Sequence, residues 1–271
     1  MISRSRTVTA YLIIVLAVSL LIGLPMYLFP SVMSSGFWPY SMKPLATRMF
    51  ASMFLAVALA MTLALWESNW ESVKILFIQG TPMYGLILLA ALMNFPKLQL
   101  TKAGAIAWLV LFSALTLGSL FIFLERNIRA KKETDPTHMK TPIHRGLKYS
   151  LLLHTIIVVA FGLQMLIVPD VALNFWPWTL PSIIMQGLGG LFIGITVGTG
   201  WAYTQKSLER VKIALPAYTT FSTLVLLAVA IDWNVIATES PSTQVTLLWL
   251  VLYAYTALYA LYYYLRQSSN R

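Results

Sequence analysis

The sequence predicts an all-α, polytopic membrane protein with eight transmembrane helices arranged as two parallel four-helix repeats. The first observation behind this prediction is composition. Hydrophobic residues make up 58% of the 271 residues and charged residues only 10%, whereas roughly 25% of a soluble domain is charged. The second is a set of apolar runs, and the third is a repeat of about half the chain length.

Eight apolar runs are long enough to cross a bilayer, which needs about 20 residues per helix. Short connections separate them, so no room is left for a separate soluble domain. The runs lie at 8–30, 44–66, 73–93, 104–124, 149–168, 181–203, 213–231 and 244–264.

The turn before the second run recurs before the sixth. Trp38 and Trp176 are 138 positions apart, as are Ser52 and Gly190. We therefore divide the chain into a first repeat at 1–124, a charged cytoplasmic linker at 125–148 and a second repeat at 149–271. An even number of spans per repeat keeps both halves in one orientation, related by an axis along the membrane normal.

The first run follows a basic start and resembles a signal peptide, but the repeat argues that it is retained. Gly23 and Met26 match Gly162 and Met165 at an offset of 139. The run is also longer than a signal core and has no clear cleavage site. We expect it to be a transmembrane helix.

The net charge of +10 follows topology rather than a nucleic-acid site. Alternate loops and the two ends of the chain hold 15 of the 19 Lys and Arg residues, and Lys43, Arg48, Lys97 and Lys102 lie on the other side. Basic residues favour the cytoplasmic side. We expect a multi-pass protein of the cytoplasmic (inner) membrane with both termini in the cytoplasm, and no nucleic-acid partner.

Two aromatic-proline turns lie at the expected outer face. They contain Trp38 and Pro39 in the first half and Trp176, Pro177 and Trp178 in the second. Tryptophan favours the headgroup region, so we interpret these residues as outer interface anchors. The alternative is a platform for an outer ligand or partner.

Small residues recur at every fourth position after each of these turns. Such spacing places them on one helix face, where two backbones can approach closely. We hypothesise that the runs at 44–66 and 181–203 pack against each other, and the alternative is packing within each half. The residues are Ser52, Ala56 and Ala60 in the first run and Gly190, Gly194 and Gly198 in the second.

Polar residues and prolines interrupt the runs at 73–93 and 213–231 at corresponding depth. Matching interruptions in two halves point to a transport site, so these residues are a candidate cavity. Kinks whose hydrogen bonds are satisfied internally are the alternative. The residues are Gln79, Thr81, Pro82 and Tyr84 in the first run and Tyr218, Thr219 and Thr220 in the second.

Arg48 lies about one turn inside the second run, where Gln186 is its counterpart 138 positions later. A cation at this depth costs a few kcal/mol unless it is paired or reaches the headgroups. We expect Arg48 either to extend toward the outer headgroups or to pair with Asp170 or Asp232. Asp232 is itself the counterpart of Asn94.

The chemistry of most membrane enzymes is missing. The chain has no cysteine, and its histidines are His138, His144 and His154, which do not form a haem or zinc pattern. No metalloprotease or serine-nucleophile motif occurs. We therefore predict no enzyme, no cofactor and no metal.

From Phe37 through Pro39, Pro44 and Leu45 to Arg48, and again from Phe175 to Pro181, the sequence resembles uncharacterised bacterial multi-pass membrane proteins with a repeated aromatic-Trp-Pro-Trp turn. The second copy departs from that pattern at Gln186. The group has no known activity, so the resemblance implies an architecture and no mechanism.

For function, the sequence favours an integral membrane protein without catalytic machinery, namely an accessory or scaffold subunit. Its expected partners are the lipid bilayer and the helices of membrane partner subunits. The alternative is a passive transporter or channel for a small solute. A transporter requires a continuous polar cavity, whereas a scaffold should show dry packing and an apolar outer groove.

Overall fold

The computed structural model describes residues 5–40, 42–133, 141–240 and 242–268. The described chain is helical and has no named strand, and eight helices are long and apolar enough to cross a membrane. This confirms the predicted class of a multi-pass helical membrane protein. The long helices are α1 (Arg6–Leu28), α3 (Pro44–Trp66), α4 (Trp70–Met93), α5 (Ala103–Glu133), α6 (Arg145–Ile167), α8 (Ser182–Thr204), α9 (Ala214–Ile231) and α11 (Thr243–Ser268).

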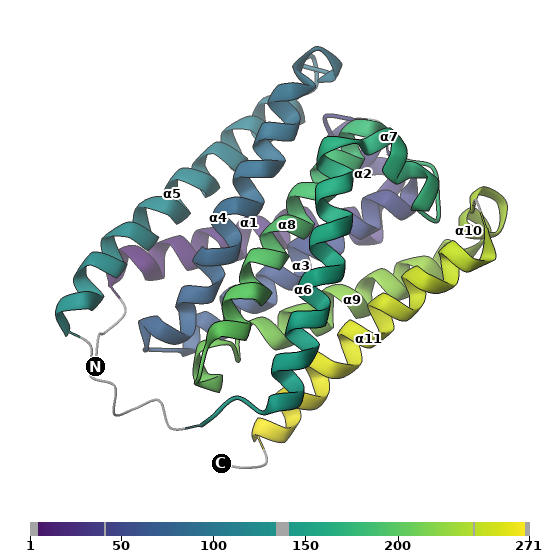
Figure 1. Ribbon diagram of the computed structural model, residues 1–271. Helices are drawn as coiled ribbons and strands as arrows, with labels where there is room; N and C mark the ends of the chain where they lie inside the picture. The colour runs from purple at the N-terminus through teal and green to yellow at the C-terminus, as the bar shows by residue number, and fades with distance from the viewer. Residues whose placement is uncertain (1–4, 41, 134–140, 241, 269–271) are drawn as a thin grey trace.

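Short helices cap the bundle. One lies in a turn near the two termini, η4 (Leu208–Arg210), and this end of the bundle is called the terminus end. The others lie at the opposite end, called the hairpin end (Figure 1). They are α2 (Pro30–Gly36), η1 (Phe95–Lys97), α7 (Pro169–Ala172), η3 (Leu173–Phe175) and α10 (Trp233–Glu239).

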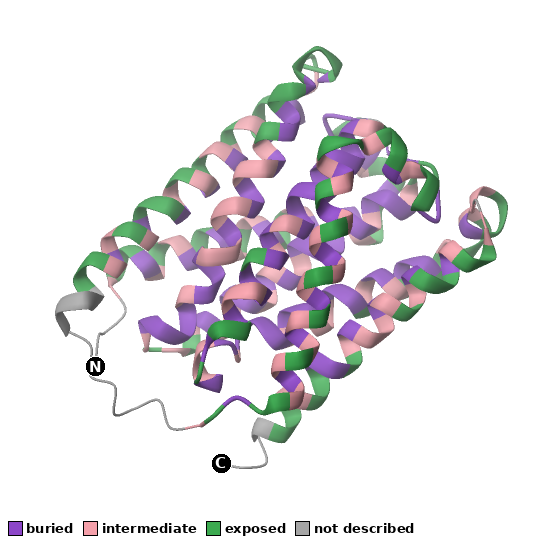
Figure 2. Cartoon of the chain, viewed as in Figure 1, coloured by how far each residue is buried: buried purple, intermediate pink, exposed green. Residues whose placement is uncertain are grey.

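The eight long helices form an inner and an outer set (Figure 2). In the most apolar stretch of each helix, 78% of α8 and 61% of α3 is buried, and α4 and α9 reach 50%. The corresponding share is only 28% in α1, α5 and α6 and 33% in α11. The outer four therefore present apolar side chains to lipid, and α3, α4, α8 and α9 are the helices that can enclose a site.

The inner helices pair across the two halves of the chain. α3 packs against α9, and α4 packs against α8. Each inner helix also has an outer neighbour from its own half: α1 on α3, α5 on α4, α6 on α8 and α11 on α9. Our hypothesis that the second and sixth spans are direct partners is therefore wrong. The alternative, packing within each half alone, also fails to describe the bundle, because each inner helix contacts a helix of the other half.

Glycines on α8 explain how closely it approaches α4. A Cβ atom placed on Gly190 would lie 2.9 Å from the backbone nitrogen of Ile87. One placed on Gly194 would lie 2.7 Å from the Cα atom of Met83. Any side chain at these positions would push the two backbones apart, so the glycines permit a van der Waals contact between helix backbones.

A second glycine contact joins α8 to α6. A Cβ atom on Gly189 would lie 2.9 Å from the carbonyl oxygen of Gly162. α8 is thus held between two helices through glycines on different faces, which accounts for its deep burial.

The segment expected to be a linker is partly helical. α5 continues to Glu133 and α6 begins at Arg145, so only the interior of the 125–148 segment lies between helices. His138 and Lys140 fall outside the described residues. Beyond them, the backbone of Ile143 bonds to the Lys206 carbonyl, and that of Leu208 bonds to the Thr141 carbonyl. The end of the segment is therefore attached to the turn after α8.

Candidate functional site

A cavity lies where the four inner helices meet, and we call it the central cavity. Its empty volume is about 480 Å³ when the open space at its mouth is included. Ala56 and Ala60 of α3 leave space on one side, and Leu191 of α8 and Phe221 of α9 lie among its other walls. The predicted small-residue face of α3 thus borders a cavity shared by both halves of the chain.

Gln79 and Tyr218 join the two halves at this cavity. The Tyr218 hydroxyl donates a hydrogen bond of 2.8 Å to Gln79 Oε1, and both side chains line the cavity. Gly198 makes room for this pair, since a Cβ atom there would lie 2.5 Å from Gln79 Oε1. The bond matters because an unpaired amide or hydroxyl in an apolar interior costs about 1–3 kcal/mol.

The other predicted cavity residues have varied surroundings. Tyr84 lines the cavity and is buried. Thr81 instead bonds to Ser119 Oγ at 2.7 Å, and Thr219 donates to the Leu215 carbonyl oxygen at 3.2 Å. Pro82 and Thr220 are half-buried and lie outside the cavity lining. Three of the seven predicted residues therefore border the cavity, and two threonines satisfy their hydroxyls elsewhere.

An ion pair and an amide pair join the halves at the hairpin end. Arg48 of α3 pairs with Asp232 at the end of α9, and its Nε donates to the Tyr27 carbonyl oxygen at 3.1 Å. Asn94 at the end of α4 donates to Gln186 of α8 at 2.5 Å. Of the two fates expected for Arg48, the structure therefore has the pair with Asp232. Asp170 instead accepts a hydrogen bond from Ser182.

Glu239 forms a further link at this end. Its carboxylate contacts Lys43 Nζ at 2.5 Å and accepts a hydrogen bond of 3.1 Å from the Thr179 amide. Partial burial raises the pKa of Glu239, but the bonds from Lys43 and Thr179 outweigh that effect, so its pKa is lowered.

Ion pairs also join the halves at the terminus end. Glu71 of α4 contacts Arg210 of η4 at 3.1 Å, and Glu67 pairs with Lys212 just before α9. The central cavity thus lies between two layers of polar contacts, and each layer includes residues of both halves.

The tryptophans of the aromatic turns are buried inside the protein. Trp38 and Trp176 are each 1% exposed and Trp178 is 3% exposed, and Pro39 and Pro177 are buried beside them. The interpretation of these tryptophans as headgroup anchors therefore needs correction, because an anchor must reach the lipid boundary. They pack against α5 and α11 instead: the Trp38–Trp108 and Trp176–Trp249 ring centroids are both 4.5 Å apart.

The central cavity has no charged lining residue among the described part of the chain. Its walls are methionine, aliphatic and aromatic side chains with one amide and two tyrosine hydroxyls. Such a surface suits a small neutral molecule that has an apolar body and a hydrogen-bonding group. Within the described residues, no three His, Asp or Glu side chains come together as a metal site.

Sequence reasoning missed a second cavity that contains His154. The sequence gives His154 no role, since it forms no haem or zinc pattern, yet it is buried with Ser222 beside an aromatic cluster. A lone histidine in an apolar run carries no pattern of its own. Aligning the halves could have revealed the cavity, because Ser222 stands 138 positions after the much larger Tyr84.

The chain was compared with protein-family models, curated proteins and solved structures, and none of them matches it.

Proposed function

We propose that this chain is a passive carrier for a small neutral solute, which binds in the central cavity. The observation that supports the proposal is a cavity lined by residues of both halves that lies between two layers of polar contacts joining them. In transporters built from repeats, the binding site lies at the repeat interface near the bilayer midplane.

Opening would require the polar contacts of one layer to separate while the other layer stays closed. The hairpin-end layer includes Arg48–Asp232 and Lys43–Glu239, and the terminus-end layer includes Glu71–Arg210 and Glu67–Lys212. The more exposed Lys43–Glu239 pair contributes only about 0–1 kcal/mol, whereas the partly buried Arg48–Asp232 pair opposes separation more strongly. The α3–α9 and α4–α8 contacts are the surfaces that would shift.

The lining supports facilitated rather than coupled transport. No described Asp or Glu borders the central cavity, and intramembrane carboxylates are the usual groups that couple transport to protons or sodium. Solute movement would then follow the concentration gradient. Gln79 and Tyr218 would exchange their mutual hydrogen bond for bonds to the solute.

We also propose that the protein lies in a bacterial cytoplasmic membrane with both termini in the cytoplasm. The bias of Lys and Arg toward alternate loops supports this orientation. The hairpin end would then face outward.

An accessory or scaffold subunit, the function favoured by sequence, accounts less well for the inner helices. A scaffold needs dry packing between its halves, whereas the central cavity interrupts that packing where the four inner helices meet, with a lining that is mostly apolar apart from one amide and two tyrosine hydroxyls. A negative result in the labelling experiment below would favour the scaffold instead.

The absence of cysteine makes thiol accessibility a direct test. Ala56→Cys places a thiol on the central cavity, and Ala51→Cys is a matched control on the same helix that is buried outside the cavity. A membrane-impermeant methanethiosulfonate reagent is added from each side of oriented membranes. A carrier predicts labelling of Ala56→Cys from both sides, at least about tenfold faster than the control. Equal, negligible labelling of both variants would support the scaffold instead.

A further inference from the structure

We propose that the second cavity, called the His154 cavity, binds a neutral phenol-class molecule, that is, one aromatic ring bearing a hydroxyl. The cavity lies among α6, α8, α9 and α11, and its empty volume is about 430 Å³ when the open space at its mouth is included. It shares a wall with the central cavity through Ile195, Tyr218 and Phe221. It is otherwise a separate site, and the inference does not depend on transport.

Unpartnered polar atoms point to a ligand. Among the described residues, His154 Nδ1, Ser222 Oγ and the Tyr253 hydroxyl have no hydrogen-bond partner. Their residues are only 5%, 1% and 6% exposed and line the same cavity. Leaving such groups unpaired in an apolar interior costs about 1–3 kcal/mol each. A hydroxyl suits them because it can donate one hydrogen bond and accept another.

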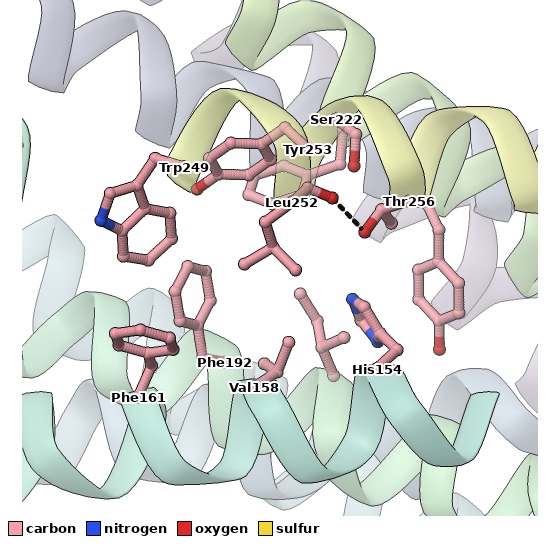
Figure 3. A pocket seen from close by; sticks show the side chains of 12 residues that line it. His154, Val158, Phe161, Phe192, Ser222, Trp249, Leu252, Tyr253 and Thr256 are labelled. Carbon is pink, nitrogen blue, oxygen red and sulfur yellow. Dashed lines mark hydrogen bonds between the residues drawn. The ribbon is translucent and has the colours of Figure 1, made fainter. Parts of the chain in front are cut away.

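The rest of the lining favours an aromatic ring. Figure 3 shows Phe161, Phe192 and Trp249 gathered at one end, while His154 lies at the other end with Thr256. The Tyr253 ring stacks on Trp249 at the aromatic end, so the polar groups that could bind a hydroxyl at the other end are those of His154 and Ser222. Aromatic side chains favour edge-to-face or offset contacts with a further ring. Water alone could satisfy the polar atoms but would leave the aromatic end empty.

The charge of the ligand follows from what lines the cavity. None of the lining residues in the described chain is Asp, Glu, Lys or Arg. A charged ligand would lose its hydration without gaining a counter-ion, which is costly in an apolar interior. The ligand is therefore neutral.

Helix arrangement gives such a ligand a route from the bilayer. α6 packs mainly on α8, and α11 packs mainly on α9. In Figure 1, α6 and α11 diverge from the terminus end toward the hairpin end. The seam between them faces lipid, into which a neutral phenol partitions.

In the first half, a large tyrosine ring takes the place that the small Ser222 holds beside the His154 cavity. Tyr84 occupies the position 138 residues before Ser222, and its ring lies 6.1 Å from that of Phe112. Gly80 stands 138 positions before Tyr218 and leaves space for the Tyr84 ring, which a Cβ atom there would approach to 3.2 Å. The order of large and small residues is thus reversed between the halves.

This reversal supplies the variants for a binding test. Ser222→Tyr copies the first half and fills the cavity. His154→Val copies Val15, which lies at the corresponding place in α1. Thr223→Tyr is the matched control, because Thr223 is exposed and outside the cavity. The protein is reconstituted in nanodiscs, and binding of radiolabelled p-cresol is measured by equilibrium dialysis, with p-xylene as a competitor of similar shape that lacks the hydroxyl.

The wild type and Thr223→Tyr should bind p-cresol at one saturable site. Ser222→Tyr should lose that site, and His154→Val should bind at least about tenfold more weakly. Equal uptake by the wild type and Ser222→Tyr would overturn the proposal, because it would show partition into lipid alone. Equally effective competition by p-xylene would overturn the hydroxyl recognition. Should Ser222→Tyr fail to fold, Ser222→Ala and His154→Val decide the question, because they remove polar atoms without adding bulk.

Discussion

Arg48 and Asp232 form an ion pair that joins α3 to the end of α9 at the hairpin end of the bundle. The residues 138 positions from them, Gln186 and Asn94, form a neutral pair between α8 and α4. Arg48 and Gln186 even donate to matching carbonyl oxygens, those of Tyr27 and Leu166, which are 139 positions apart. One junction therefore exists in a charged and an uncharged version.

The uncharged version should substitute for the charged one. We expect Asp232→Asn to lower stability by about 3 kcal/mol, because Arg48 keeps its charge at a partly buried site. Adding Arg48→Gln should restore most of the loss by copying Gln186 and Asn94. Thermal unfolding in detergent of both single variants and the double variant measures the coupling. Additive losses in the double variant would show that the pair does not act as a unit.

Close packing of α8 on α4 should make Gly194 intolerant of any side chain. Gly194→Ala brings a Cβ atom to 2.9 Å from the Gln79 carbonyl oxygen, and we expect a loss of roughly 1–3 kcal/mol from overpacking. Gly200→Ala is the control, since its Cβ atom would meet only the Thr155 methyl, at 3.6 Å. Equal melting temperatures for the two variants would contradict the proposed contact.

The Gln79–Tyr218 bond should contribute to stability. Tyr218→Phe removes the donor and leaves Gln79 Oε1 without it, which should cost about 1–3 kcal/mol. Tyr203→Phe serves as the control because Tyr203 is 37% exposed. Chemical denaturation compares the two. A Tyr218→Phe variant as stable as the control would mean that water or lipid replaces the bond without cost.

Acid should weaken the Glu239 link. Burial raises the pKa of Glu239, but the bonds from Lys43 and Thr179 outweigh it, so the folded pKa lies below the ordinary value of 4.5. Its contribution is therefore full at neutral pH and is lost as the pH falls below 4.5 through the lowered pKa. We expect the wild type to have a higher melting temperature than Glu239→Gln at pH 7. The difference between the two melting temperatures should shrink as the pH falls below 4.5. A difference independent of pH would contradict this assignment.

Sequence alone predicted the elements of the fold because apolar length is a local property. The eight spans needed only runs of about 20 residues, and fourfold spacing identified the face that contains Gly190 and Gly194. Helix partners were not predicted, since the same glycine face could meet any neighbour that lacks bulk. Its actual partner, α4, is set by the whole arrangement of turns and side chains.

The aromatic turns and the His154 cavity show a different limit. Trp38 and Trp176 near helix ends fit an interface belt and a buried aromatic cluster equally well by composition, and only packing distinguishes the two. The His154 cavity depends on a reversal of residue size between the halves. The second half has Tyr218 and Ser222 where the first has Gly80 and Tyr84. Such an exchange leaves hydropathy almost unchanged, so no apolar pattern reveals it.

The central claim is that the central cavity opens at one end while the other stays closed. The most direct measurement adds a bis-maleimide bridge between Lys43→Cys and Glu239→Cys, whose parent side chains are in contact, and then measures the thiol accessibility of Ala56→Cys in the bridged protein. The maleimides must react before the Ala56→Cys thiol does, which the deep position of that thiol favours. We predict that the bridge abolishes labelling from the hairpin side and leaves labelling from the terminus side intact. Unchanged labelling from both sides would contradict the alternating closure of the two ends.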